Sequence, residues 1–274
     1  MINEETLTQQ WIDKVSKSNR NADKILVEKV IRALLMLQGL SNVGLPFVFK
    51  GGTALMLLLN SAKRLSIDID IIISKAPKDL EEMMQAVGKD QGFNKVELQH
   101  RTTASGIEKA HYKFFYTPIH QTHPGDDYVL LDILFENNNY SNVSLHEIKS
   151  QFISNTGKGA KISMPSVEDL LGDKLTAFAP NTTGVPYLRN ENSMSMEIIK
   201  QLYDIGNLFD EVNDLEVIKK TFGKFVKTEI GYRNLKKFHL LKCWKILTKQ
   251  PFVYHYEEQM VKATLMNCSK AYNG

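Results

Sequence analysis

Two aspartates, Asp68 and Asp70, are separated by a single residue in the isoleucine-rich segment SIDIDIII. Aspartate is a poor strand former, so a pair of aspartates in a strand-like segment indicates a chemical role. Alternate residues of a strand project from the same face, and a strand at residues 67–73 would therefore present both carboxylates together. Neighbouring carboxylates repel each other unless a cation binds, and hard oxygen ligands favour Mg²⁺. The pair predicts a divalent metal site.

A third aspartate, Asp132, lies in the apolar segment YVLLDILF, which predicts another strand at residues 128–135. On a strand beside the first, its carboxylate would allow two metal ions to be bridged. One ion would activate an attacking hydroxyl and the other would hold a triphosphate. Taken alone, Asp132 could equally be an ordinary polar residue of an edge strand, so its candidacy depends on Asp68 and Asp70.

A glycine turn, Gly51-Gly52, precedes the aspartate pair and is followed by Thr53. The turn comes after a short β-type segment at 47–49, and Thr53 can cap a helix that continues to residue 59. Glycines allow backbone N–H groups to approach phosphate oxygens, and the start of a helix adds its positive end. Carboxylates for metal ions and a glycine turn for phosphates together predict phosphoryl transfer from a nucleotide.

The elements that would position these residues form a mixed α/β half followed by a helical half. Helical periodicity occurs at 21–40 and 78–87, and further β-type segments occur at 95–99 and 111–116. From residue 166 the pattern is helical, with a segment rich in Pro, Gly and Asn at 180–195 that is typical of a long loop. The later helices are expected at 166–178, 195–209, 215–227, 235–247 and 256–269. This order predicts an α+β protein with a boundary near Pro165.

The segment FKGGTALMLLLNSAKRLSIDIDIII resembles the first motif of the polymerase-beta-like nucleotidyltransferases and, within them, the AbiEii/AbiGii toxin family. That family commonly shows Lys-Gly-Gly-Thr-Ala-Leu followed by Arg-x-Ser-x-Asp-x-Asp. The residues that match are Lys50, Gly51, Gly52, Thr53, Ala54, Leu55, Arg64, Ser66, Asp68 and Asp70.

Two later segments extend the resemblance to about residue 209. PSVEDLLGDKLTAF is similar to a family motif that contains a functional lysine, here Lys174. IIKQLYDIGNLF stands where the family usually shows Arg-Asp-x-x-Asp. Only Asp204 carries over from that motif, because Lys200-Gln201 replaces Arg-Asp.

The resemblance implies a polymerase-beta-like fold, with a mixed sheet flanked by helices in a nucleotidyltransferase core at 1–165. A C-terminal helical domain at 166–274 would contribute Lys174, Asp204 and a basic surface. The implied reaction moves a nucleoside monophosphate from an NTP onto an acceptor with Mg²⁺, or Mn²⁺, as cofactor. Characterised members of the family are toxins that modify tRNA ends and are usually encoded beside an antitoxin, so RNA and an antitoxin are the expected partners.

The resemblance also assigns roles to residues. Asp68, Asp70 and Asp132 would bind the metal, and Asp132 could in addition act as the general base. Lys174 would neutralise triphosphate charge, with Asp204 beside it in the catalytic set. The expected nucleotide-binding residues are Lys50, Gly51, Gly52, Thr53, Arg64 and Ser66.

Basic residues are concentrated near the C-terminus. The chain has a net charge of +3, whereas residues 215–250 contain ten Lys or Arg and only two acidic residues. This density is typical of a surface that binds a phosphate backbone, which favours RNA as the acceptor. The same residues could instead form the solvated faces of amphipathic helices.

Other features narrow the class of protein. The sequence contains no apolar run of the length, about 18 residues, that a membrane span needs, and the polar start MINEETLTQQWIDK argues against a signal peptide. Two cysteines, Cys243 and Cys268, imply neither a disulfide framework nor a zinc site. We therefore expect a cytoplasmic protein.

Three alternative functions compete with RNA modification. The same chemistry could act on a protein hydroxyl or a small molecule, which the basic C-terminal region argues against. An Asp-x-Asp glycosyltransferase would leave Gly51-Gly52 and Asp132 without a role. An inactive binding module of the same fold would be expected to lack a metal carboxylate, and all three are present.

Overall fold

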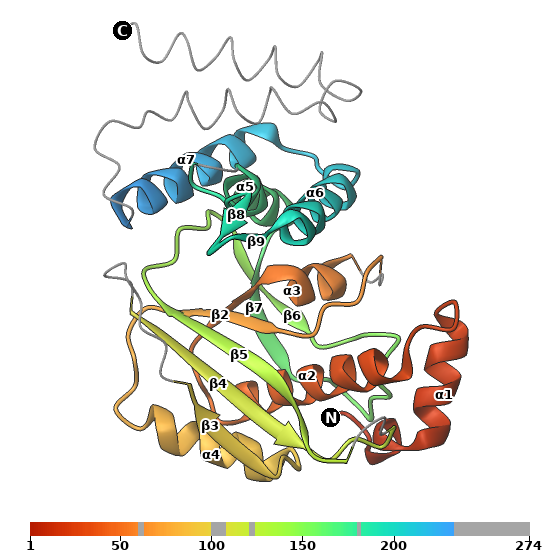
Figure 1. Ribbon diagram of the computed structural model, residues 1–274. Helices are drawn as coiled ribbons and strands as arrows, with labels where there is room; N and C mark the ends of the chain where they lie inside the picture. Colours follow the sequence, from red (N-terminus) through yellow and green to blue (C-terminus); the bar gives the residue numbers. More distant parts are fainter. Residues whose placement is uncertain (60–62, 100–107, 121–123, 180–181, 233–274) are drawn as a thin grey trace, which may run out of the picture. The chain divides into compact units, whose positions relative to one another are not determined.

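The computed structural model describes residues 1–59, 63–99, 108–120, 124–179 and 182–232. The chain divides into two compact units, Met1–Ser166 and Val167–Gly274 (Figure 1). A mixed sheet with helices occupies the first unit, and the described part of the second is mainly helical. The predicted α+β fold class is therefore confirmed.

In the described residues of the first unit, seven strands form one sheet in the order β3-β4-β5-β2-β1-β7-β6. β2 runs parallel to β5 and antiparallel to β1, and β1 runs parallel to β7. The strands that carry Asp70 and Asp132 are therefore neighbours inside the sheet, and Asp132 is not on an edge strand. The strands are β1 (Val48–Lys50), β2 (Ile69–Ile73), β3 (Lys95–Leu98), β4 (Lys109–Tyr116), β5 (Asp127–Phe135), β6 (Val143–Glu147) and β7 (Lys161–Pro165).

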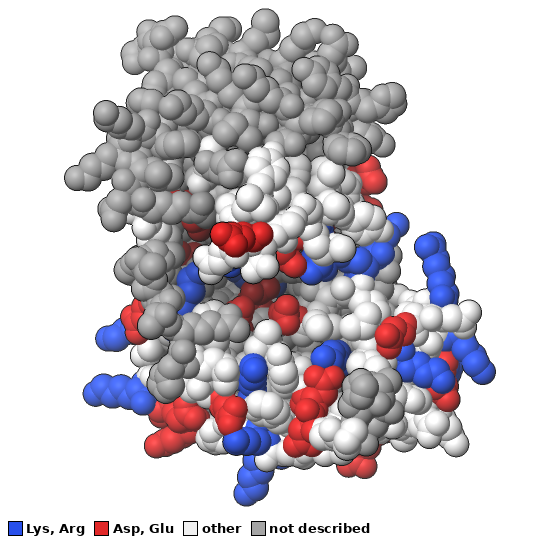
Figure 2. Space-filling model, viewed as in Figure 1, with Lys and Arg blue, Asp and Glu red and all other residues white. Residues whose placement is uncertain are grey.

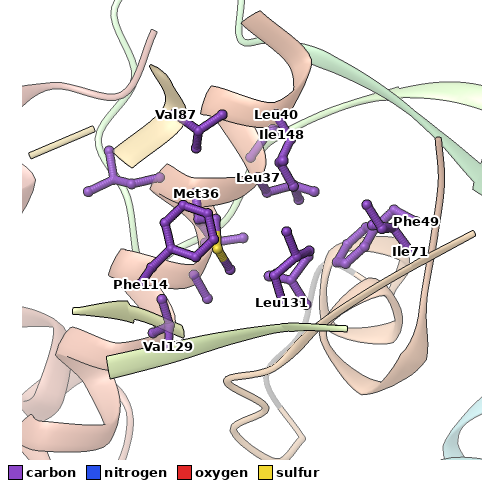
Figure 3. Close-up of a cluster of buried hydrophobic side chains, with 14 of the residues drawn as sticks. Met36, Leu37, Leu40, Phe49, Ile71, Val87, Phe114, Val129, Leu131 and Ile148 are labelled. Atoms are coloured by element: carbon purple, nitrogen blue, oxygen red, sulfur yellow. The ribbon is translucent and has the colours of Figure 1, made fainter. Parts of the chain in front are cut away.

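The core of the first unit lies between one face of the sheet and its helices. Figure 3 shows Met36 and Leu37 of the long helix α2 close to Phe114, Val129 and Leu131 of the sheet. Burial along β4 and β5 alternates, as expected for strands with one face on the core. The helices of this unit are η1 (Glu4–Leu7), α1 (Gln9–Ser18), α2 (Lys24–Asn42), α3 (Gly51–Leu58) and α4 (Leu80–Asp90).

The alternation decides which residues of β4 and β5 remain available for chemistry. Tyr112 faces the core, where burial, assisted by the charge of Glu81, raises the pKa of its hydroxyl to about 12. His111, the residue before it, projects from the opposite face of the strand. Asp132 does the same between the buried Leu131 and Ile133. On β4 and β5 one face is therefore buried in the core, and the other carries His111 and Asp132.

The second unit is built on three helices, α5 (Val167–Phe178), α6 (Ser195–Phe209) and α7 (Leu215–Tyr232). Phe178, Phe222 and Val226 form the centre of a separate small core. The side chain of Thr221 on α7 donates a hydrogen bond to the buried carboxylate of Asp169 on α5. Side-chain packing and this buried bond together join α5 to α7.

Several local expectations need correction. The segment 180–195 is not a continuous loop, because β8 (Leu188–Arg189) and β9 (Asn192–Ser193) form a hairpin. Its turn residues Asn190 and Glu191 have φ angles of 47° and 66°, the left-handed conformation of a two-residue hairpin turn. The sequence also did not indicate α1 or β6.

The remaining C-terminal expectations concern residues outside the described part of the chain. These are the helices at 235–247 and 256–269 and six of the ten basic residues: Arg233, Lys236, Lys237, Lys242, Lys245 and Lys249. Within the described part, none of the helices combines the length and apolarity that crossing a bilayer requires.

Candidate active site

Four polar residues lie side by side across four neighbouring strands of the first unit. In the register of the sheet, His111 of β4 is opposite Asp132 of β5, and Asp132 is opposite Asp70 of β2. Asp70 is in turn opposite Lys50 of β1. Directly opposite residues project from the same face, on strands about 4.8 Å apart. We call His111, Asp132, Asp70 and Lys50 the polar row.

Asp68 does not lie on the strand, contrary to the expectation that both aspartates would. β2 begins at Ile69, so Asp68 is the last residue before the strand, and its side chain is exposed. Its carbonyl oxygen accepts a hydrogen bond of 2.7 Å from the hydroxyl of Thr53. The backbone before β2 is thereby tied to α3, which keeps Asp68 close in sequence and space to the polar row.

The role expected of Thr53 also changes. Thr53 does not cap a helix, because α3 begins at Gly51 with Lys50 as its N-cap residue. The Thr53 side chain is completely buried, and its hydroxyl donates to the carbonyl oxygen of Asp68. The hydroxyl therefore positions the backbone at Asp68, and only the backbone N–H of Thr53 is suited to bind phosphate.

Gly51 is required where the chain turns from β1 into α3. Its φ angle is +82°, a conformation that side chains with a Cβ rarely adopt. A Cβ at this position would lie 2.1 Å from Oδ2 of Asp70. The carboxylate of Asp70 therefore packs directly against the first backbone unit of α3, where the positive end of the helix favours negative charge.

Gly52 is also closely approached by side chains, in this case those of Arg64 and Ser66. A Cβ here would lie 2.7 Å from Nη2 of Arg64 and 2.7 Å from Oγ of Ser66. A guanidinium and a hydroxyl are thus brought against the start of α3. Backbone N–H groups, a fixed positive charge and a hydroxyl together form an arrangement that can bind phosphate oxygens.

The donor set of the row fits a hard divalent cation. Asp70 and Asp132 present carboxylate oxygens from adjacent strands. Among the residues that the structure describes, no three His, Cys, Asp or Glu side chains are grouped so that they could hold a metal ion. Asp68, Asp70 and Asp132 are therefore not a preformed three-carboxylate cage. Mg²⁺ commonly uses one or two carboxylates together with water and substrate phosphates, which is compatible with this arrangement.

His111 is part of this site although the sequence did not indicate it. Its Nδ1 lies 2.5 Å from Oδ1 of Asp132, and its side chain is only 13% exposed. The signal in the sequence would have been a histidine at an outward position of the strand at 111–116. That signal becomes specific only when the register of β4 on β5 is known.

In the second unit, Lys174 and Asp204 form a buried ion pair. Nζ of Lys174 lies 2.8 Å from Oδ2 of Asp204, and the two side chains are 11% and 1% exposed. Lys174 also donates to Oε1 of Gln201 at 3.2 Å. Gln201 stands where the family motif has aspartate, so an amide oxygen here replaces a second carboxylate. Lys174 is therefore not a lysine of the helix surface.

A protein-family model described as "Nucleotidyl transferase AbiEii toxin, Type IV TA system" matches residues 35–250 of the 274. The match includes the polar row, the start of α3 and the Lys174–Asp204 pair. The chain belongs to the AbiEii family. It is therefore a nucleotidyltransferase and the toxin of a type IV toxin–antitoxin system, for which an NTP substrate and an antitoxin are implied.

Two solved structures that resemble this AbiEii chain have low sequence identity to it. JHP933 from Helicobacter pylori is 16% identical, with 97% of this chain and 98% of that chain covered and a TM-score of 0.46. An antigenic nucleotidyltransferase-like protein from Paracoccidioides brasiliensis is 14% identical, with 81% and 93% covered and a TM-score of 0.45. Neither likeness is close enough to support an argument about function. A search of curated proteins gives no match.

Proposed function

We propose that this chain transfers a nucleoside monophosphate from an NTP to the end of an RNA, with tRNA as the acceptor. The observation that carries the proposal is the polar row beside the start of α3. Asp70 and Asp132 are direct neighbours on adjacent strands, and the carboxylate of Asp70 touches the backbone of Gly51. Metal ligands and phosphate donors thus meet at one point of the first unit.

Asp70 and Asp132, with Asp68 before the strand, would bind Mg²⁺ or Mn²⁺. The bound cation would neutralise charge on the phosphates and would make the attacking hydroxyl more acidic. The backbone N–H groups of Gly52 and Thr53 bind phosphate oxygens at the positive end of α3. Arg64 and Ser66, which lie against Gly52, add a charged and a neutral donor, and Lys50 adds positive charge from the end of the row.

The reaction needs one group that takes up a proton. The hydroxyl oxygen of the RNA attacks the α-phosphorus of the NTP, the bond from that phosphorus to the oxygen that bridges the α- and β-phosphates breaks, and pyrophosphate leaves. Asp132 takes the proton from the hydroxyl, a role that its place in the row supports. Lys174 neutralises negative charge on the triphosphate. Asp204 and Gln201 hold the lysine side chain in place for this role.

A basic stripe on α7 supports an RNA acceptor. Lys220, Lys224 and Lys227 recur at helical spacing and therefore project from one side of α7. Lys220 and Lys227 are exposed. By contrast, acidic and basic side chains are interspersed over the face of residues 1–166 seen in Figure 2. Within α7 the basic residues outnumber the two acidic residues, Glu216 and Glu229, so this helix is the described segment that favours a phosphate backbone.

The test is a transfer assay with the full chain, Mg²⁺, each α-labelled NTP in turn and total tRNA. We expect label in RNase-sensitive material with the wild type and none with Asp70→Asn. Asp126→Asn is the matched control, because Asp126 is an exposed carboxylate bonded to Asn94 and Thr117. If a protein or a small molecule is labelled and the RNA is not, that molecule is the acceptor in place of RNA. Transfer to no acceptor would overturn the proposal.

A further inference from the structure

His111 is held against Asp132 by the geometry of the backbone. The two residues are direct partners in the antiparallel pairing of β4 with β5, where side chains of opposite residues are about 5 Å apart at Cβ. The contact between Nδ1 and Oδ1 is 2.5 Å. The imidazole therefore needs no long or flexible side chain to reach the carboxylate, and its position is fixed by two central strands.

The two partners of this contact differ in how far they are buried. The side chain of His111 is 13% exposed and that of Asp132 is 35% exposed. The histidine is thus the more enclosed partner, and the aspartate is the one that a substrate or cation can reach. A group that is enclosed behind an accessible carboxylate can orient it without contacting the ligand itself.

The chemistry of the contact restricts both partners. A carboxylate that binds a metal ion is ionised and only accepts hydrogen bonds, so in this role of Asp132 it is Nδ1 of His111 that carries the hydrogen and donates it to Oδ1. That bond fixes the plane of the carboxylate and leaves Oδ2 as the oxygen that can serve a cation or take a proton. Hydrogen bonds to charged groups are stronger than neutral ones, and such outer partners of metal ligands set ligand orientation.

We propose that His111 is a positioning residue for Asp132, which it holds by the Nδ1–H···Oδ1 hydrogen bond so that Oδ2 faces the cation and the acceptor hydroxyl. This inference rests on the proposed function, because it assumes that Asp132 is a ligand and base. It adds a fourth strand, β4, to the elements that build the active site. It also predicts that the site requires a hydrogen-bond donor at the place of Nδ1, and that the rest of the imidazole ring is not required.

Three substitutions separate the donor from the ring. In His111→Asn the side-chain amide nitrogen takes the place of Nδ1, in His111→Gln it lies nearer the place of Nε2, and His111→Leu has no donor. We expect His111→Asn to bind Mn²⁺ within about threefold of the wild type. We expect the Leu and Gln variants to bind it about 10- to 100-fold more weakly, the range for lost outer partners. Binding of Mn²⁺ alone is read by electron paramagnetic resonance, and transfer kcat is measured in parallel.

Controls make each outcome decisive. His146→Asn alters another strand histidine, which bonds to Ser144 on β6, and should change neither quantity. Circular dichroism and thermal unfolding of each variant show that the chain is folded. Mn²⁺ binding by His111→Leu at wild-type strength would overturn the inference, as would recovery in the Gln variant but not in the Asn variant. If Asp70→Asn also binds Mn²⁺ normally, the proposed metal site itself fails; if only the His111 variants do, the positioning role alone fails.

Discussion

The Lys174–Asp204 ion pair allows a structural role and a catalytic role to be separated. Its atoms are 2.8 Å apart, and the side chains are 11% and 1% exposed, so both charges are largely removed from water. Removing one partner of such a pair leaves an uncompensated buried charge, which costs about 3–5 kcal/mol. We expect Lys174→Met to lower the free energy of unfolding by that amount, because the buried carboxylate of Asp204 then loses the ammonium group of Lys174.

A double-mutant cycle measures the pair directly. Asp204→Asn alone should also destabilise the chain, since it removes the negative charge opposite Lys174. The double variant Lys174→Met/Asp204→Asn has no buried charge at this place. It should be about 2 kcal/mol more stable than the sum of the single effects predicts, within the range for residues in contact. Urea unfolding followed by circular dichroism at 222 nm supplies the four free energies.

Nucleotide transfer by the wild type, the two single variants and the double variant decides the role of Lys174. If the lysine neutralises triphosphate charge, the double variant regains stability but not nucleotide transfer. Additive free energies would refute the ion pair as a stabilising contact. Recovery of transfer together with stability would refute the catalytic role and leave Lys174 as a structural residue of α5.

Three further substitutions test the first unit and the basic stripe. Gly51→Ala should abolish transfer, because the φ of +82° is strained for alanine and the new Cβ would lie 2.1 Å from Oδ2 of Asp70; wild-type turnover would show that this close approach is dispensable. Thr53→Val should cost about 1–2 kcal/mol in urea unfolding through the lost bond to the Asp68 carbonyl; no loss of stability would contradict that contact. Lys220→Ala and Lys227→Ala should each reduce the salt slope of RNA binding by about 1; an unchanged slope would remove α7 from the RNA surface.

Local spacing made part of the site predictable. Asp68-x-Asp70 and Gly51-Gly52 occur in one stretch of chain, so the sequence alone predicted that these residues lie close together, although the strand period failed for Asp68, which precedes β2. The apolar context of Asp132 placed it on a strand. That its strand lies beside β2 is a property of the sheet order, and β2 and β5 pair across about 60 residues of chain.

Other features depend on contacts that no local pattern specifies. The place of His111 opposite Asp132 follows from strand register, and a shift of one residue would turn it to the other face of the sheet. Thr53 was expected to cap a helix because threonine precedes an apolar helical segment. Gly51 instead starts the helix, because its left-handed φ lets the chain turn directly from β1. The partners of Lys174 depend on how α6 packs against α5.

The most direct test of the proposed chemistry compares α-labelled with γ-labelled NTP in the presence of Mg²⁺ and tRNA. Nucleotidyl transfer predicts that label from the α-phosphate moves into RNA, that label from the γ-phosphate appears in pyrophosphate, and that Asp70→Asn abolishes both. Movement of the γ-label into an acceptor, or transfer that persists in Asp70→Asn, would contradict a nucleotidyltransferase site built on the polar row.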